Sequence, residues 1–394
     1  MTFVSRHIRT LAFSTLLAVA PAGSALAQTS EAAVERFKAL VEEFGGDVSW
    51  SDVSYSGSSA ELLGVTVKNG DETFPIGTIK LNDISQVDNG YRVESITMDD
   101  YRIDGDEDTV VAISGVALGG VLLPNEGEQD NYGGFLFYET ADVKKMSVNV
   151  AGTEVLTLSD THFEATTPEG GQPMDYSGAV ENFTLDLSLI EDANQKAVVQ
   201  ALGYEQLSGY MEMEGSWNPT DGRLTMSKNA VTVVDAGTLD FQLDLGGYTP
   251  AFIASLRELQ QKMADDAGGD NSAQGMAALG LMQQLTFNSA NLGFVDDSLT
   301  NKVLEFVAKG QGVSANDLKN QAKAVVPFAL AQLNAPDLTA KASQAISAFL
   351  DDPQSLWINA EPENPVPFAL IAAEGMSAPQ GLVKTLGVTV TSNE

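Results

Sequence analysis

The sequence predicts an α+β fold, in which a large, curled antiparallel β-sheet built as a meander carries C-terminal amphipathic helices packed on its apolar face. Two observations predict it. From about residue 47 to 248, short segments alternate apolar and polar residues with a period of two, which is typical of antiparallel strands with one side on a core. From residue 251 onward the apolar spacing is mainly helical. We expect three regions: a signal peptide at 1–27, an N-terminal helix with the β-meander at 28–250, and a mainly helical region with a few strands covering the sheet at 251–394.

The N-terminal region has the features of a secretory signal peptide. Arg6 and Arg9 precede a short apolar run at 11–20, and an A-x-A cleavage motif follows at 25–27. Cleavage there would make Gln28 the first residue of an exported protein, which we place in the periplasm. The apolar run is shorter than the roughly 20 residues that span a bilayer, so we expect no transmembrane anchor after cleavage. The chain has no cysteine, which excludes disulfides and a lipoprotein anchor.

The meander is predicted strand by strand. An amphipathic helix at 29–44 opens the mature chain, and Asn89-Gly90 and Asp221-Gly222 are typical hairpin turns, as is Asn69-Gly70. A short helix at 189–202 is expected to cross over between strands. Strands are expected at 62–68, 76–81, 91–98, 109–118, 146–150, 183–189, 210–217, 223–227 and 239–245.

The last third is predicted to supply the cover for the sheet. Helical spacing of apolar residues begins at Phe252, and Ser314-x-x-Asp317 is a capping motif. Glycines and acidic residues at 265–272 predict a flexible linker. Helices are expected at 252–263, 276–282, 298–309, 314–333 (interrupted by Pro327) and 338–350, with strands at 286–295, 355–360 and 386–391.

The charge of the chain limits its partners. There are 54 acidic and 21 basic residues, a net charge of −33, and loss of Arg6 and Arg9 with the signal peptide would bring it to −35. Such a surface repels nucleic acid and anionic membrane faces, so we expect no nucleic-acid partner. Because the acidic residues are spread along the chain, we interpret them as a solvated surface adapted to salt.

The stretch DGDED, residues 104–108, resembles the start of a calcium loop. An EF-hand beginning at Asp104 would need glycine at its sixth position and glutamate at its twelfth, where the chain has Thr109 and Gly115. A looser metal site made by Asp104, Asp106 and Asp108, with help from Asp99 and Asp100, remains the alternative. We favour an acidic turn between two strands.

Common catalytic patterns are missing from the sequence. The mature chain has a single histidine, His162, which alternation places on a strand face with Asp160 and Glu164, and no G-x-S-x-G motif is present. One histidine without cysteine excludes the common zinc sites, and the glycine pairs do not match phosphate-binding loops. We predict no cofactor and no enzymatic activity. A hydrolase that uses two carboxylates stays open only because acidic residues are abundant.

Methionines and aromatic residues are concentrated in the last third. We expect them to fill the core between sheet and helices, since methionine packs adaptably. The alternative is that they line an apolar groove for an acyl chain. The residues are Met276, Met282, Phe287, Phe294, Phe306 and Phe328.

The strand rhythm of residues 203–247, GYEQLSGYMEMEGSWNPTDGRLTMSKNAVTVVDAGTLDFQLDLGG, resembles that of bacterial periplasmic AsmA-like proteins. Those proteins are usually far longer and carry a membrane anchor. The resemblance implies a curled sheet with an apolar concave face and a role in lipid handling or envelope maintenance. We therefore expect a non-enzymatic protein that holds a lipid or other hydrophobic ligand. The alternative is a structural or protein-interaction module of the envelope, bound to another envelope protein.

Overall fold

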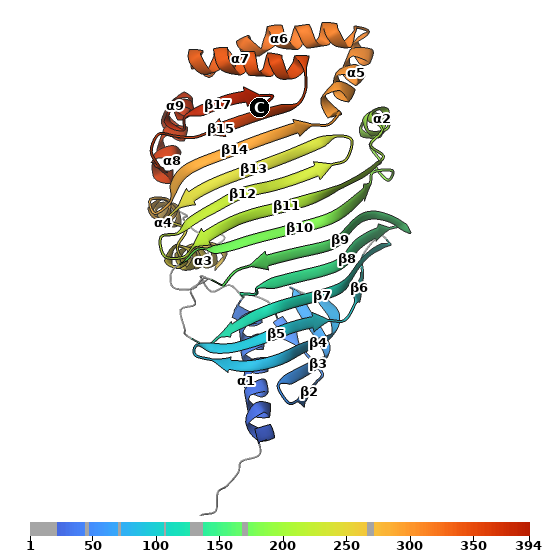
Figure 1. Cartoon of the computed structure of the whole chain (residues 1–394), viewed down its shortest axis with the longest axis vertical. Helices are drawn as coiled ribbons and strands as arrows, with labels where there is room; N and C mark the ends of the chain where they lie inside the picture. The colour runs from blue at the N-terminus through green and yellow to red at the C-terminus, as the bar shows by residue number, and fades with distance from the viewer. Residues whose placement is uncertain are drawn as a thin grey trace, which may run out of the picture.

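A computed structural model shows an open antiparallel sheet with helices at its margins, the α+β meander that the sequence predicts (Figure 1). The structure describes residues 22–43, 47–69, 72–105, 108–126, 137–167, 172–265 and 272–394. Most of the predicted signal peptide, the predicted turn residue Gly70 and most of the predicted linker at 265–272 lie outside these ranges. Within these ranges, the chain forms one sheet of 17 strands and nine α-helices. Every strand pairing in the sheet is antiparallel.

Strands that follow one another in the chain mostly lie side by side, as in a meander. The series runs without interruption from β7 to β15, with β1 and β2 at one margin and β17 at the other. The strands are β1 (Asp47–Ser49), β2 (Asp52–Ser56), β3 (Ser59–Asn69), β4 (Glu72–Val87), β5 (Gly90–Met98), β6 (Tyr101–Asp104), β7 (Thr109–Pro124), β8 (Thr140–Val150), β9 (Thr153–Ala165), β10 (Met174–Asp186), β11 (Gln206–Asn218), β12 (Arg223–Val233), β13 (Gly237–Gly246), β14 (Thr286–Asp296), β15 (Ser355–Ala360), β16 (Val366–Pro367) and β17 (Val388–Ser392).

The helices gather mainly in the C-terminal third. Figure 1 shows α6 and α7 beyond β17, α3, α4, α8 and α9 at one end of the strands, and α2 and α5 at the other end. Their bounds are α1 (Ala22–Glu43), α2 (Ala193–Leu202), α3 (Pro250–Asp265), α4 (Ser272–Met282), α5 (Leu299–Gln311), α6 (Ala315–Ala331), α7 (Pro336–Asp351), α8 (Phe368–Ser377) and α9 (Leu382–Thr385). In the described part of the chain no helix is both long and apolar enough to cross a membrane.

The main core lies under α1. One stripe of this helix, Val34, Phe37 and Leu40, is buried against apolar side chains of the first strands, among them Leu62 and Leu81. A fully buried leucine contributes roughly 1.5–3 kcal/mol, so this stripe accounts for the attachment of the helix. The helix starts at Ala22, upstream of the predicted start at 29, so the expected cleavage site lies within it.

The middle of the sheet has far less helical cover than the sequence analysis expects. The C-terminal helices reach the sheet at its margin and at the strand ends: α7 packs on β17 and β15, α8 and α9 contact β16 and β17, and α3 and α4 pack near Trp217. The expected boundary at residue 250 coincides with the start of α3, but β14 pairs with β13 across it. One sheet therefore runs through both expected regions.

Two further details differ from the sequence-based expectations. The helix α2, capped by Asp192 and Gly203, joins β10 to its antiparallel neighbour β11. It is therefore part of a hairpin connection, and the expected crossover is not formed. The segment Phe368–Ser377, for which no helix is predicted from the sequence, forms α8 directly after Pro367. By contrast, the capping motif is confirmed: the Ser314 hydroxyl accepts from the Asp317 backbone N–H, and the Asp317 carboxylate accepts from the Ser314 N–H.

Candidate functional site

The register of the sheet joins apolar side chains of neighbouring strands into one surface. Phe241 of β13 lies opposite Leu292 of β14, which lies opposite Ile358 of β15. Leu239, two residues before Phe241, is opposite Val231 of β12. Because directly opposed residues point to the same side of a sheet, these five side chains share one face. We call them the open apolar face.

The open apolar face is exposed to solvent. Leu239 is 52% exposed and Ile358 is 47% exposed, and Val231, Phe241 and Leu292 are also exposed. Single exposed apolar residues are ordinary on a protein surface, but a contiguous group on adjacent strands marks a site of interaction. The other face of the same strands is polar, with Asp240, Gln242 and Asp244 on β13 alone.

Aromatic rings continue this face toward β9 and lie against glycines of the neighbouring strand. A Cβ added to Gly209 would stand 2.7 Å from the ring of Phe183, and a Cβ added to Gly215 would stand 2.5 Å from the ring of Tyr176. Both glycines belong to β11 and both rings to β10. The lack of a side chain at these positions lets the rings cover the backbone closely. Phe183 is buried there, and Tyr176 is half-buried.

The rings also connect the open apolar face to the core under α1. Tyr176 stacks on Phe163 with ring centroids 6.4 Å apart, and Phe163 meets Tyr138 edge to face at 5.7 Å. Tyr138 in turn packs against the core cluster. The apolar side of the sheet is therefore continuous from the α1 core to β15.

Helices close the apolar side at its margins. Trp217 and Leu224 at the ends of β11 and β12 are covered by Phe252 and Ile253 of α3. The Trp217 indole Nε1–H donates to the Tyr248 carbonyl at 2.8 Å, which satisfies its polar atom. At the other margin, Phe349 of α7 meets Phe294 of β14 edge to face at 6.3 Å.

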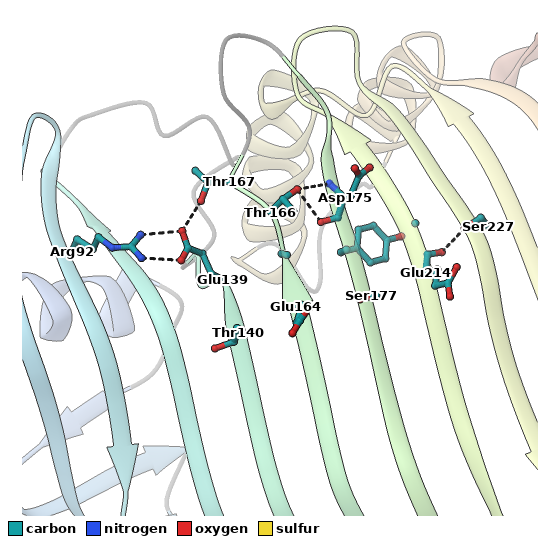
Figure 2. Close-up of a pocket in the computed structure, with 13 residues that line it drawn as sticks. Arg92, Glu139, Thr140, Glu164, Thr166, Thr167, Asp175, Ser177, Glu214 and Ser227 are labelled. Atoms are coloured by element: carbon teal, nitrogen blue, oxygen red, sulfur yellow. Dashed lines mark hydrogen bonds and ion pairs between the residues drawn. The ribbon is translucent and has the colours of Figure 1, made fainter.

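Polar side chains gather in a hollow of about 860 Å³ where β5 and β8–β12 come together near their ends (Figure 2). Its charged lining is one arginine and four carboxylates: Arg92, Glu139, Glu164, Asp175 and Glu214. The rest of the lining consists of the threonines and serines labelled in Figure 2 together with Ala165, Tyr176 and Gly215. A hollow with this charge repels anions.

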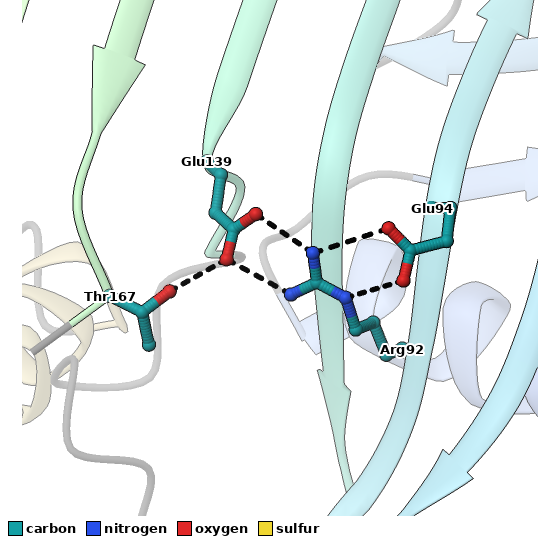
Figure 3. Close-up of polar contacts among 4 residues, drawn as sticks. All are labelled: Arg92, Glu94, Glu139 and Thr167. Atoms are coloured by element: carbon teal, nitrogen blue, oxygen red, sulfur yellow. Dashed lines mark hydrogen bonds and ion pairs between the residues drawn. The ribbon is translucent and has the colours of Figure 1, made fainter. Parts of the chain in front are cut away.

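The arginine of the hollow is fully engaged by protein groups (Figure 3). Arg92 donates to Glu139 at 3.0 and 2.8 Å and to Glu94 at 2.7 and 3.3 Å, and the Thr167 hydroxyl donates to Glu139 at 2.8 Å. The hydrogen bonds from Arg92 hold the pKa of Glu139 below its usual range, with Thr167 adding to the effect against partial burial. Gly120 of β7, at φ 61°, leaves room for the Glu139 side chain to pass over the strand. The cluster therefore ties strands together and offers no free cation to a ligand.

His162 is also held by carboxylates. Its Nδ1 lies 2.6 Å from Asp142 of β8 and its Nε2 lies 2.9 Å from Glu164. The hydrogen bonds to Asp142 and then Glu164 raise the pKa of the imidazole above its usual value, which favours its charged form. Asp160, expected on the same face, stands instead at a break in strand pairing with φ 51°. The partner Asp142 could not be found by local spacing because it comes from the neighbouring strand.

The acidic stretch at 104–108 is described only in part. Asp104 forms an ion pair with Arg102 at 2.9 Å, and the Asp108 carbonyl accepts from Ala151 N–H, while Asp106 lies outside the described residues. The two acidic neighbours have structural partners, since Asp99 accepts from Thr78 N–H and Asp100 from Gly115 N–H. No three acidic or histidine side chains in the described ranges come together as a metal site would require.

The methionines and aromatic residues of the last third divide between two environments. Phe287 is buried, as expected of a core residue, and Phe294 packs on α7. Met276 is 70% exposed and Phe328 is 78% exposed, and Met282 is exposed as well. The expectation that these residues fill a core is wrong for Met276, Met282 and Phe328. They sit on helices whose outer sides have no neighbour in the described structure.

A family model described as "Uncharacterized protein" matches residues 230–393. The matched range includes all five residues of the open apolar face and the helices α3 to α9. No curated protein matches the chain.

Proposed function

We propose that this is an exported, non-enzymatic protein of the periplasm that binds a lipid or another hydrophobic molecule on the open apolar face. The observation that supports it is the exposure of Leu239, Phe241, Leu292 and Ile358 on adjacent strands. Burying a large apolar side chain from water yields roughly 1.5–3 kcal/mol, so an acyl chain lying across four such residues has a substantial driving force. A role in envelope maintenance follows if that ligand is a lipid.

The shape of the surface also suits an elongated ligand. The apolar side continues from the open face toward the α1 core through Phe183, which is buried, and Tyr176, which is half-buried, and helices limit it at the margins. Ligand sites are mostly apolar with few polar groups, which this surface matches better than the acidic hollow does. The open apolar face runs across β12 to β15, so a long acyl chain fits across these strands.

A matched pair of variants on one strand tests the proposal. Leu292 and Val295 are both 42% exposed on β14, but they point to opposite faces of the sheet. Leu292→Asp places a charge in the binding surface and is expected to weaken binding of a fluorescent fatty acid at least tenfold. Val295→Asp places the same charge on the polar face and is expected to bind as the unaltered protein does.

Two outcomes contradict the proposal. One is that the unaltered protein, purified gently from its own host, releases no lipid into organic solvent and binds no fluorescent fatty acid. The other is that both variants lose binding equally, which would place the site elsewhere. In the first case the interaction-module alternative gains weight, and recovery of an envelope protein at low salt is the next measurement.

Export has its own test. The mass of the protein isolated from its host is expected to correspond to a chain that begins at Gln28. A mass that includes residues 1–27 would contradict the proposed cleavage and the proposed location.

A further inference from the structure

Two neighbouring helices at one end of the sheet carry almost no charge. The sequence of α4, SAQGMAALGLM, has no charged residue, and that of α8, FALIAAEGMS, has only Glu374. The two helices contact each other. They stand out in a chain with 54 acidic residues.

The inner sides of these helices are attached to the apolar side of the sheet. Leu281 of α4 packs against the cluster formed by Trp217 and Phe252. Phe368 of α8 meets Phe287 of β14 edge to face, with ring centroids 6.4 Å apart. Both contacts lie at the strand ends, so the two helices border the same apolar side that contains the open apolar face.

The outer sides are apolar and exposed. Met276 is 70% exposed and Met376 is 79% exposed, and Leu279, Met282 and Leu370 are exposed too. We call these five residues the α4–α8 patch. Apolar groups of this size on adjacent helices mark an interaction surface, and methionine side chains adapt to a partner without fixed shape.

We propose that the α4–α8 patch inserts into the interface of a lipid bilayer made of zwitterionic lipids. This inference rests on the proposed function, because docking there would bring the end of the open apolar face to the source of its ligand. The helices that carry the patch also pack on the apolar side of the sheet, through Leu281 against the Trp217 cluster and Phe368 against Phe287, which favours a lipid surface over an unrelated partner. Neither helix has lysine or arginine, the groups that attract helices to anionic lipids, and the net charge of −33 opposes such lipids.

Flotation with phosphatidylcholine vesicles tests the inference. We expect the protein purified from its own host to float with the vesicles. The fraction of the double variant Met276→Glu/Met376→Glu that floats is expected to be at least tenfold smaller. Vesicles enriched in an anionic lipid are expected to bind less protein at low salt. The matched control is Phe328→Glu on α6, where the residue is 78% exposed away from the patch, and this variant should float normally.

Several results would overturn the inference. They are absence of flotation of the unaltered protein, unchanged flotation of the double variant, or equal loss in Phe328→Glu. A dimer that the double variant converts to monomer would assign the patch to a second copy of the chain. Fatty-acid binding without vesicles separates the two proposals: if it persists while flotation fails, only the membrane docking is wrong. If flotation holds while fatty-acid binding is absent, the docking stands and the proposed ligand site is wrong.

Discussion

At the scale of single residues, Gly209 controls how closely an aromatic ring can approach the sheet. A Cβ at this position would stand 2.7 Å from the Phe183 ring and would also collide with the Thr232 carbonyl. We expect Gly209→Ala to lower the free energy of unfolding by about 1–3 kcal/mol, the usual cost of overpacking. The control is Gly310→Ala in α5, where the added Cβ meets nothing and helix propensity should raise stability by about 0.5–1 kcal/mol. Urea unfolding of both variants measures the difference, and equal midpoints would contradict it.

His162 offers a second test at this scale. Its pKa is raised by hydrogen bonds to Asp142 and Glu164, so the stability from these bonds is complete below the usual histidine pKa near 6.5 and is lost as pH rises through the raised value. Proton NMR of the imidazole should therefore give a midpoint above 6.5. Asp142→Asn is expected to move that midpoint down. A midpoint at or below the usual value in the unaltered protein would mean that the two carboxylates do not hold the ring in solution.

Glu139 should respond to pH in the opposite direction. Hydrogen bonds from Arg92 lower the pKa of Glu139. The stabilisation of the folded state by this carboxylate is therefore present above the usual glutamate pKa and is lost as pH falls through the lowered value. We expect Glu139→Gln to cost about 1 kcal/mol of unfolding free energy at pH 7, after allowance for partial exposure of the cluster. The cost should shrink below about pH 4. Denaturant melts at both pH values measure this, and a cost independent of pH would disprove the assigned cause.

At the scale of elements, α7 protects the last strand of the sheet. It lies against β17, Phe349 packs on Phe294, and the Asn393 side chain donates to the Asp352 carbonyl at 2.9 Å. An uncovered edge strand is a template for aggregation. Phe349→Ala should lower the free energy of local unfolding by about 3–5 kcal/mol. Hydrogen exchange in β17 should then become faster, and light scattering on heating should increase. Exchange confined to α7, with β17 still protected, would show that the helix does not guard the edge.

The elements also show which parts of the fold local sequence can predict. Strands such as β12 and β13 follow from alternation because one face is apolar and the turn residues Asp221-Gly222 are adjacent. The helix α8 was not predicted, since a proline-rich stretch precedes it and its apolar residues have no single stripe. The role of α2 also required the tertiary structure, because spacing cannot tell a crossover from a hairpin connection between neighbours such as β10 and β11.

At the scale of the whole molecule, the one-sided sheet was predictable, but its uncovered middle was not. Alternation at Leu239 and Phe241 shows that one face is apolar, and only long-range packing decides whether a helix covers it. The same limit applies to Met276 and Phe328, whose types are those of core residues. The residues of the candidate site were therefore visible in the sequence as apolar positions, and their exposure was not.

The net charge of the whole molecule predicts how its thermal stability depends on salt. The net charge is −33, and repulsion between the carboxylates spread over the chain opposes folding. Salt weakens this repulsion, because the Debye length falls from about 10 Å at 0.1 M to about 3 Å at 1 M. We expect the melting temperature to rise with sodium chloride and then level off, because screening is complete once the Debye length is shorter than the spacing between charges. General salting-out would instead give a steady rise without a plateau. A melting temperature that is flat or falls with salt in a calorimetric series would mean that the acidic surface does not strain the folded state.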